Sequence, residues 1–140
     1  MRREKGFTLI ELVLVIAVLG VLAVSALPNL FDISLTNARN NARDGVVGAV
    51  QAGLSLYGAN QISQGNTESY PTLLETSDLA DGTASSRTNP LFNNILQGGV
   101  TRDWTKKNDT CYTYTGGGAT DDYQYTAGTT GTFVFASGGC

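Results

Sequence analysis

The chain has 140 residues, which is enough for one domain but not for two. It contains no histidine and only two cysteines, which excludes a histidine-based catalytic triad, a histidine metal site and an all-cysteine zinc site. The net charge of −3 argues against nucleic acid as a main partner. We therefore expect a protein that is not an enzyme, binds no specific nucleic acid and uses no cofactor or metal.

The N-terminus combines a basic patch with a long apolar run. Arg2, Arg3 and Lys5 precede residues 7–31, in which Glu11 is the single charged residue. As a helix this run would reach roughly 37 Å and cross a hydrocarbon core of about 30 Å. Because basic residues stay on the cytoplasmic side, the rest of the chain is expected outside the inner membrane, where disulfides form. On topology alone, a cleaved signal peptide or a simple membrane anchor is an alternative.

Glu11 has no use in a plain membrane anchor. A carboxylate at the centre of a membrane helix costs about 2.5–3.5 kcal/mol, and less near an end. The nearest available cation would be the new amine produced if the chain were cut before Phe7. Between staggered helices, the amine of one chain would meet the acid of the next, which would neutralise both charges and set an axial register.

Residues 6–12, Gly-Phe-Thr-Leu-Ile-Glu-Leu, resemble the processing and assembly signature of type IV prepilins and of the related pseudopilins of type II secretion. A short charged leader ending in glycine, the phenylalanine after it and a glutamate four residues later define that signature. The resemblance implies that a prepilin peptidase cuts between Gly6 and Phe7 and methylates the Phe7 amine. It also implies that Glu11 pairs with the Phe7 amine of a neighbouring subunit. Residues 28–32, followed by a helix, somewhat resemble pilins of the mannose-sensitive haemagglutinin type.

One helix is expected to run from Phe7 to about Asn60. Gly20 weakens it by about 1 kcal/mol relative to alanine, and Pro28 removes a backbone donor, so a kink or local melting is expected. The resemblance implies melting near this proline in a filament, and a kink fixed by packing is the alternative. Beyond Pro28, apolar or small residues at spacings of three and four predict one face that packs on the head. That face comprises Leu35, Ala38, Ala42, Val46, Ala49, Val50, Gly53, Leu54 and Tyr57. Small residues at Gly45, Gly48, Ala52 and Gly53 either permit close contacts or are simply tolerated.

Residues 61–140 form the expected head. A short helix is predicted over about Pro71–Leu79. Alternating residues between glycine-rich turns predict antiparallel strands at Thr110–Thr115, Asp122–Thr126 and Thr132–Ala136. The expected fold class is α+β, with a long N-terminal helix packed on a small antiparallel sheet, and the resemblance implies the same fold. The expected division is a leader at 1–6, a helix at 7–60 and the head.

Cys111 and Cys140 are the only cysteines. In an exported protein an even count suggests a disulfide, and free or metal-bound thiols are the alternative. Closing a loop of this size would stabilise the fold by about 3.5 kcal/mol. The bridge resembles the C-terminal disulfide-bounded region of type IV pilins.

Three further patterns carry little weight by themselves. Trp104 beside Lys106 and Lys107 would suit contact with a partner or DNA, but two lysines are few. The acidic pair at 121–122 follows three glycines and would suit a calcium loop, although an acidic turn is the simpler interpretation. Residues 108–110 match a glycosylation sequon, which is a short and common pattern.

The sequence therefore predicts the major structural subunit of a type IV pilus. It would wait in the inner membrane as a precursor and then polymerise with identical copies into an extracellular filament. Its implied partners are a prepilin peptidase and the pilus assembly machinery. The alternatives are a type II secretion pseudopilin and a minor, tip-located pilin. The sequence does not distinguish adhesion, twitching motility and DNA uptake.

Overall fold

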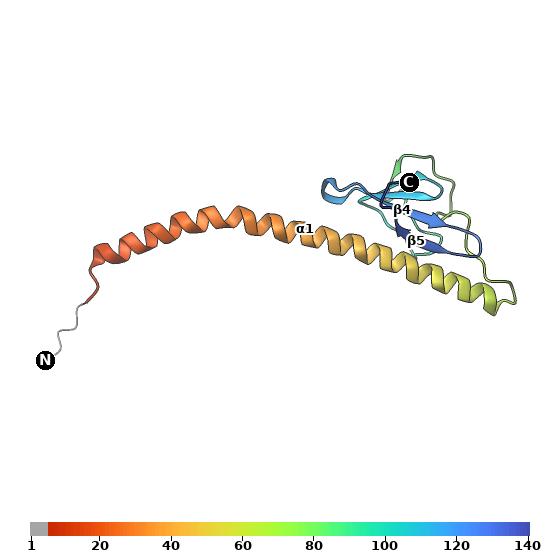
Figure 1. The fold of residues 1–140 in the computed structure, drawn as a ribbon, viewed down its shortest axis with the longest axis horizontal. Helices are drawn as coiled ribbons and strands as arrows, with labels where there is room; N and C mark the ends of the chain where they lie inside the picture. Colours follow the sequence, from red (N-terminus) through yellow and green to blue (C-terminus); the bar gives the residue numbers. More distant parts are fainter. Residues whose placement is uncertain (1–5) are drawn as a thin grey trace. The chain divides into compact units, whose positions relative to one another are not determined.

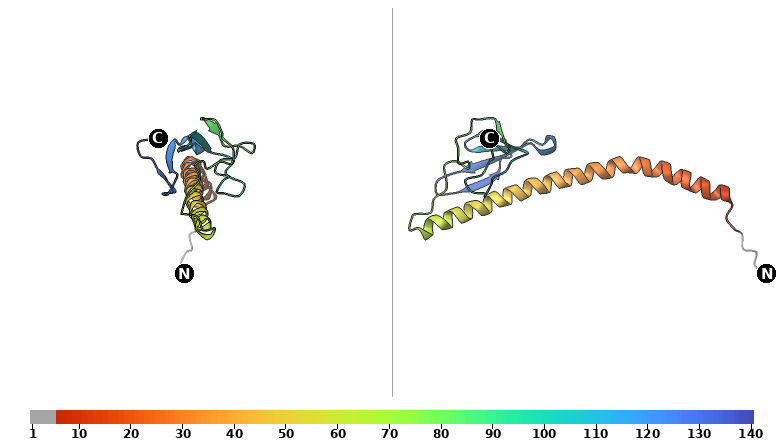
Figure 2. Two further views of the ribbon diagram at one scale, coloured as in Figure 1. Left: turned by 90° about the vertical axis from the view of Figure 1, so that its right-hand side faces the viewer. Right: turned by 180° about the vertical axis from the view of Figure 1, so that it is seen from behind.

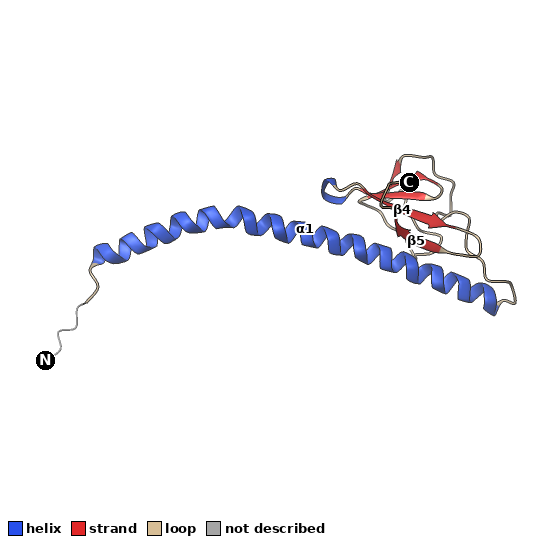
Figure 3. Ribbon diagram, viewed as in Figure 1, coloured by secondary structure: helices blue, strands red, loops and turns tan. Residues whose placement is uncertain are grey.

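The computed structural model describes residues 6–140, and for residues 27–33 it describes the backbone only. The chain divides after Ala38 into two compact units. Figure 1 traces the described residues as a ribbon coloured along the sequence. The element order is α1 (Leu9–Ser63), β1 (Thr83–Ala84), β2 (Trp104–Asn108), β3 (Cys111–Tyr114), the 3-10 turn η1 (Gly116–Gly118), β4 (Asp121–Thr126) and β5 (Thr132–Phe135). The α+β class with a long N-terminal helix is confirmed (Figure 3).

The C-terminal end of α1 is set by a glycine. The helix ends at Ser63, three residues beyond the predicted Asn60. Gly65 takes a φ of +79°, and its N–H donates to the carbonyl of Ile62 at 3.0 Å. The N–H of Asn66 donates to the carbonyl of Gln61, also at 3.0 Å. These two bonds form a Schellman motif, in which a left-handed glycine closes the last turn.

The strands form one five-stranded antiparallel meander in the order β1-β2-β3-β4-β5. β3, β4 and β5 coincide with the predicted strands to within one residue at each end. β1 and β2 were not predicted. β1 has two residues, and β2 reads Trp-Thr-Lys-Lys-Asn, so a buried lysine stands where the alternation needs an apolar residue.

The core lies within residues 39–140, where the C-terminal half of α1 meets one face of the sheet. In the end-on view of Figure 2 the strands gather on one side of this helix segment. Val50 and Leu54 of α1 are buried together with aromatic residues from the sheet and its loops. Those aromatic residues are Phe92, Trp104, Tyr112, Tyr114, Tyr123, Tyr125 and Phe133. Phe135, two residues beyond Phe133 at the end of the edge strand β5, is 56% exposed.

The predicted helical face is buried only in part. Leu35, Ala38 and Ala42 are exposed, and burial begins in the turn before Val50. A Cβ on Gly53 would come within 2.9 Å of the carbonyl oxygen of Ile95. By contrast, a Cβ on Gly45 or Gly48 would meet no atom within 4 Å. Within the described residues, close approach is therefore required at Gly53 and not at Gly45 or Gly48.

The predicted helix at Pro71–Leu79 is wrong. Its backbone groups bond to distant segments instead of to one another. The Leu74 carbonyl accepts from the Asn94 N–H at 3.0 Å, and the Leu73 carbonyl accepts from Asn94 Nδ2 at 2.8 Å. Asn93 Oδ1 accepts from the N–H of Thr76 at 2.8 Å. Tertiary contacts thus take the groups that a helix would use, which overrides the local propensity.

Candidate functional site

Helix α1 begins with one half of a capping box, in which the Glu11 side chain reaches back to Thr8. Thr8 precedes the first helical residue, and Glu11 lies three residues after it. One carboxylate oxygen of Glu11 accepts from the Thr8 backbone N–H at 2.9 Å and from the Thr8 hydroxyl at 2.8 Å. The Thr-x-x-Glu spacing is the sequence signature of this motif, so residues 8–11 alone could have indicated that Glu11 caps the helix. In this chain, Glu11 therefore stabilises the helix start.

The residues predicted for processing and assembly lie together. Gly6, Phe7, Thr8 and Glu11 line one shallow hollow at the helix start. Phe7 is 90% exposed and Gly6 is exposed as well, so none of the described residues buries the Gly6–Phe7 pair. In the uncut chain the Phe7 nitrogen belongs to that peptide bond. The pairing of Glu11 with a Phe7 amine therefore requires cleavage, and it stays a prediction.

The first part of α1 is not covered by any of the described residues. Residues 9–26 form a span with a mean hydropathy of 2.8, and none of it is buried. Length and composition suit a membrane span, as they also suit a signal sequence. Gly20 lies in this span, and a Cβ there would meet no atom within 4 Å. A surface this apolar needs lipid or other protein chains around it.

Pro28 falls within the stretch whose side chains lie outside the described residues. The helix assignment is continuous through this position. The predicted kink or melting at Gly20 and Pro28 therefore stays a prediction.

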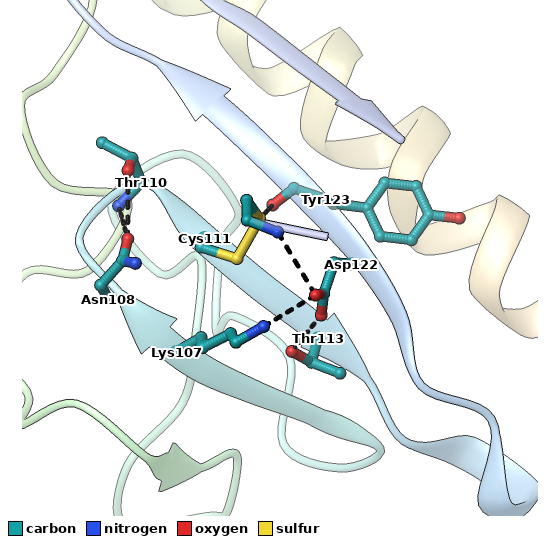
Figure 4. Close-up of a disulfide and its surroundings, with 8 residues drawn as sticks. Lys107, Asn108, Thr110, Cys111, Thr113, Asp122 and Tyr123 are labelled. Carbon is teal, nitrogen blue, oxygen red and sulfur yellow. Dashed lines mark hydrogen bonds and ion pairs between the residues drawn. A yellow bond between two sulfur atoms is a disulfide. The ribbon is translucent and has the colours of Figure 1, made fainter. Parts of the chain in front are cut away.

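The predicted disulfide between Cys111 and Cys140 is present, with a Cα–Cα distance of 5.7 Å. It joins strand β3 to the C-terminal residue (Figure 4). Cys111 is buried in the sheet, and the tail leading to Cys140 follows β5. The bridge thus ties the end of the chain to the centre of the sheet.

Asp122 connects the disulfide region to three strands, a role that sequence reasoning missed. One carboxylate oxygen accepts from the Thr113 hydroxyl at 2.6 Å. The other accepts from Lys107 Nζ at 2.9 Å and from the Cys140 N–H at 3.4 Å (Figure 4). Hydrogen bonds from Thr113 and Lys107 hold the pKa of Asp122 below its usual range. No sequence pattern reveals this role, because the partners of Asp122 lie on β2, on β3 and in the segment after β5.

The acidic pair at 121–122 is engaged by protein cations. Arg43 Nη1 lies 2.6 Å from an Asp121 carboxylate oxygen, and Lys107 pairs with Asp122. Both carboxylates therefore already have cationic partners at the position where the sequence would suit a calcium loop.

Two of the three residues considered for a partner contact, Trp104 and Lys106, are buried, so that suggestion is wrong for them. Trp104 is 1% exposed and the Lys106 side chain is fully buried. Lys106 Nζ lies 2.7 Å from an Asp109 oxygen and donates to the Leu79 carbonyl at 2.8 Å. Only Lys107 faces solvent, with a half-exposed side chain.

A second buried charge lies in the same head. Glu75 is 2% exposed, and one of its oxygens accepts from the Tyr112 hydroxyl at 3.1 Å. The other oxygen has no hydrogen-bond partner among the described residues. Burial raises the pKa of Glu75 above its usual value, and it also raises the pKa of Tyr112. Sequence reasoning placed Glu75 in a short helix that does not form and therefore missed it.

Comparisons with known proteins agree with the N-terminal features. Residues 1–27 match the family model described as the prokaryotic N-terminal methylation motif. Over 49 residues the chain is 51% identical to the type IV wide pilus major component PilA4 of Thermus thermophilus. That alignment covers 35% of this chain and 34% of the relative, so it spans about a third of each protein. No solved structure matches the chain.

Proposed function

We propose that this chain, which carries the N-terminal signature of type IV pilins, is the major structural subunit of a type IV pilus. One observation carries the proposal. An exposed apolar helix follows directly after the exposed residues Gly6 and Phe7, and none of the residues that the structure describes covers its first 18 residues, 9–26. The methylation motif and the partial likeness to a pilus major component support the same conclusion.

The exposed helix explains why one protein would use two environments. Each apolar side chain transferred out of water contributes about 1.5–3 kcal/mol. In the precursor, inner-membrane lipid supplies the covering for residues 9–26. In the filament, the same surface is covered by the helices of identical copies. Leaving the membrane is therefore possible only as part of a polymer.

Processing would create the charge that assembly uses. The proposed leader, residues 1–6, is removed between Gly6 and Phe7 by a prepilin peptidase, and the Phe7 amine is methylated. Glu11 then exchanges its contact with Thr8 for the amine of a neighbouring subunit. Neutralising both charges sets the axial position of each added copy. The pilus assembly machinery would supply the energy that moves the subunit from the membrane into the filament.

The head would form the outer surface of the fibre. Its disulfide requires an oxidising compartment, which fits a domain placed outside the inner membrane and later on the cell surface. The role is structural, and we assign no catalytic residues. Adhesion and motility would be properties of the assembled fibre.

Two other functions use the same N-terminal features. A type II secretion pseudopilin would show the same cleavage and membrane location, and a minor pilin would occupy few positions at a tip. The name of the Thermus thermophilus relative, a major pilus component, favours the major subunit.

The direct test is made on the native cells. Filaments are sheared from the surface and pelleted, and the intact mass and N-terminal peptide of the main band are determined. A dominant chain that starts at methylated Phe7 with both cysteines oxidised is the expected result. The same processed chain confined to the inner membrane, with no fibres, would contradict a major pilin and favour the alternatives.

A further inference from the structure

The turn between β2 and β3 has an unassigned chemical feature. Asp109 and Thr110 form a two-residue turn between Asn108 and Cys111, which are paired across the hairpin. The chain has ten asparagines, and only Asn108 is followed by the x-[Ser/Thr] pattern of an N-glycosylation acceptor. This short match gains weight from how the turn is built.

The Asn108 amide is oriented by the residue that defines the sequon. Its Oδ1 accepts from the Thr110 N–H at 2.9 Å and from the Thr110 hydroxyl at 3.1 Å (Figure 4). Both bonds use the oxygen, and Nδ2 makes no hydrogen bond within the part of the chain that the structure describes. Asn108 is half-exposed and Thr110 is exposed. The nitrogen that would accept a sugar is thus free, beside a hydroxyl fixed on the amide oxygen.

The charge within the sequon is directed away from the amide. Asp109 lies between Asn108 and Thr110, and an unpaired carboxylate would compete for the same donors. Its carboxylate pairs instead with Lys106 Nζ at 2.7 Å. The turn is also anchored, since the Thr110 carbonyl accepts from the Tyr125 N–H at 2.8 Å and the next residue is Cys111 of the disulfide. Folding therefore presents the sequon in one conformation at the surface.

We infer that Asn108 Nδ2 is an acceptor for an N-linked glycan. The donor class is a glycosyl polyprenyl-pyrophosphate, used by a transferase that acts outside the cytoplasmic membrane. The Thr110 hydroxyl stabilises negative charge on Oδ1, which eases loss of one Nδ2 proton to a base of the transferase. Nδ2 then bonds to C1 of the sugar, the bond from C1 to the pyrophosphate oxygen breaks, and its electron pair leaves with the polyprenyl pyrophosphate. This inference rests on the export of the head that the proposed function includes.

The test is the mass of the peptide that contains Asn108, taken from the native protein. The expected result is a peptide heavier by a glycan, with the modification mapped to Asn108. A peptide at the mass of the bare sequence would overturn the inference. The N-terminal peptide and the cysteine oxidation state from the same sample report on export separately. An oxidised chain starting at Phe7 with bare Asn108 would thus leave the proposed function standing.

A matched pair of variants at Thr110, together with one variant at Asn108 and one control at Asn41, distinguishes glycosylation of Asn108 from a purely structural role of the turn. Thr110→Ser keeps the hydroxyl and should retain the glycan, whereas the nearly isosteric Thr110→Val should lose it. Asn108→Gln should also lose it, and Asn41→Gln, on the exposed surface of α1 and outside any sequon, should leave the glycan unchanged. Retention of the glycan in Thr110→Val would refute the role of the hydroxyl. If the mass never differs among these variants and only thermal stability changes, the contact serves the hairpin alone and the inference is overturned.

Discussion

Glu75 shows how a single buried residue couples the head to pH. Its carboxylate is sealed in the core with one oxygen lacking a hydrogen-bond partner among the described residues, and burial raises its pKa. In the unfolded chain it titrates near its ordinary value. Between the two pKa values the folded state binds more protons than the unfolded state. The Glu75 contribution to stability therefore becomes less favourable as pH rises through the folded pKa.

Replacement of Glu75 by glutamine should stabilise the head at neutral pH. A glutamine side chain carries no charge to bury, and the expected gain is about 1 kcal/mol, the usual scale for a buried polar group. The gain should vanish at a pH below the ordinary glutamate pKa, where the carboxyl is protonated in both states. Denaturant unfolding of the full chain in detergent at both pH values measures this. Asp81→Asn, at an exposed position, is the control, and equal stability of Glu75→Gln and wild type at neutral pH would contradict the argument.

Two glycines on α1 should respond to alanine with opposite signs. At Gly53 a new Cβ would press on the Ile95 carbonyl, and backbone cannot move aside cheaply. Gly53→Ala should therefore lose about 1 kcal/mol of unfolding free energy even after the gain in helix propensity. Gly48 is open, so Gly48→Ala should gain about 0.5–1 kcal/mol. Thermal unfolding of the two variants side by side checks the pair, and the same sign for both would show that the contact at Gly53 is not decisive.

At the scale of elements, the aromatic strands and the disulfide perform different tasks. Strands β3, β4 and β5 supply five of the seven aromatic core residues that pack with the C-terminal half of α1, and they are joined by hydrogen bonds along the meander. The segment after β5 has little apolar surface. The Cys111–Cys140 bridge and the contact of Cys140 with Asp122 hold that segment on the sheet.

Removing the disulfide should weaken the head without changing its fold. Closing a loop with a sequence separation of 29 residues stabilises by about 3.5 kcal/mol through the entropy of the unfolded chain. The double variant Cys111→Ser/Cys140→Ser should lose about that much while keeping its far-ultraviolet circular dichroism. Urea unfolding measures the loss. Reduced wild type serves as the matched control, and no shift of the urea midpoint in either sample would contradict the entropic account.

At the scale of the whole molecule, a variant can separate the observed contact of Glu11 with Thr8 from its proposed role in assembly. In the uncut chain it caps α1 through Thr8, and in the proposed filament it pairs with another copy. A charge-assisted hydrogen bond is worth about 1.5–3 kcal/mol, so its loss should reduce assembly about tenfold or more. Glu11→Gln can still accept from the Thr8 N–H but carries no charge.

Glu11→Gln should therefore be cut and methylated normally, remain in the membrane and yield few filaments. Thr8→Ala removes the hydroxyl of the capping box, keeps the charge and should still assemble. The yield of sheared filaments relative to membrane-bound subunit measures both. Normal fibres from Glu11→Gln would refute the pairing, and an equal failure of Thr8→Ala would assign the effect to the helix start.

The sequence by itself determined the features that depend on local order. The cleavage and methylation signature, the apolar span and the aromatic strands β3 to β5 are set by neighbouring residues and by short periodicities. The likeness to type IV pilins followed from the first of these. The even cysteine count suggested the disulfide with one possible pair, and the structure decided between that bridge and free thiols.

Tertiary structure alone decided where polar groups are buried. Lys106 was considered for a partner contact but is buried, and its Nζ is bound by Asp109 and the Leu79 carbonyl. Because a charged residue occupies this inward-facing position, strand β2 does not show the alternation of apolar and polar residues that predicts a strand. Residues 71–79 were predicted as a helix, but their backbone groups bond to Asn93 and Asn94. In each case the deciding partner lies outside the local pattern. Local propensities are worth less than about 1 kcal/mol per residue, so a few such bonds override them.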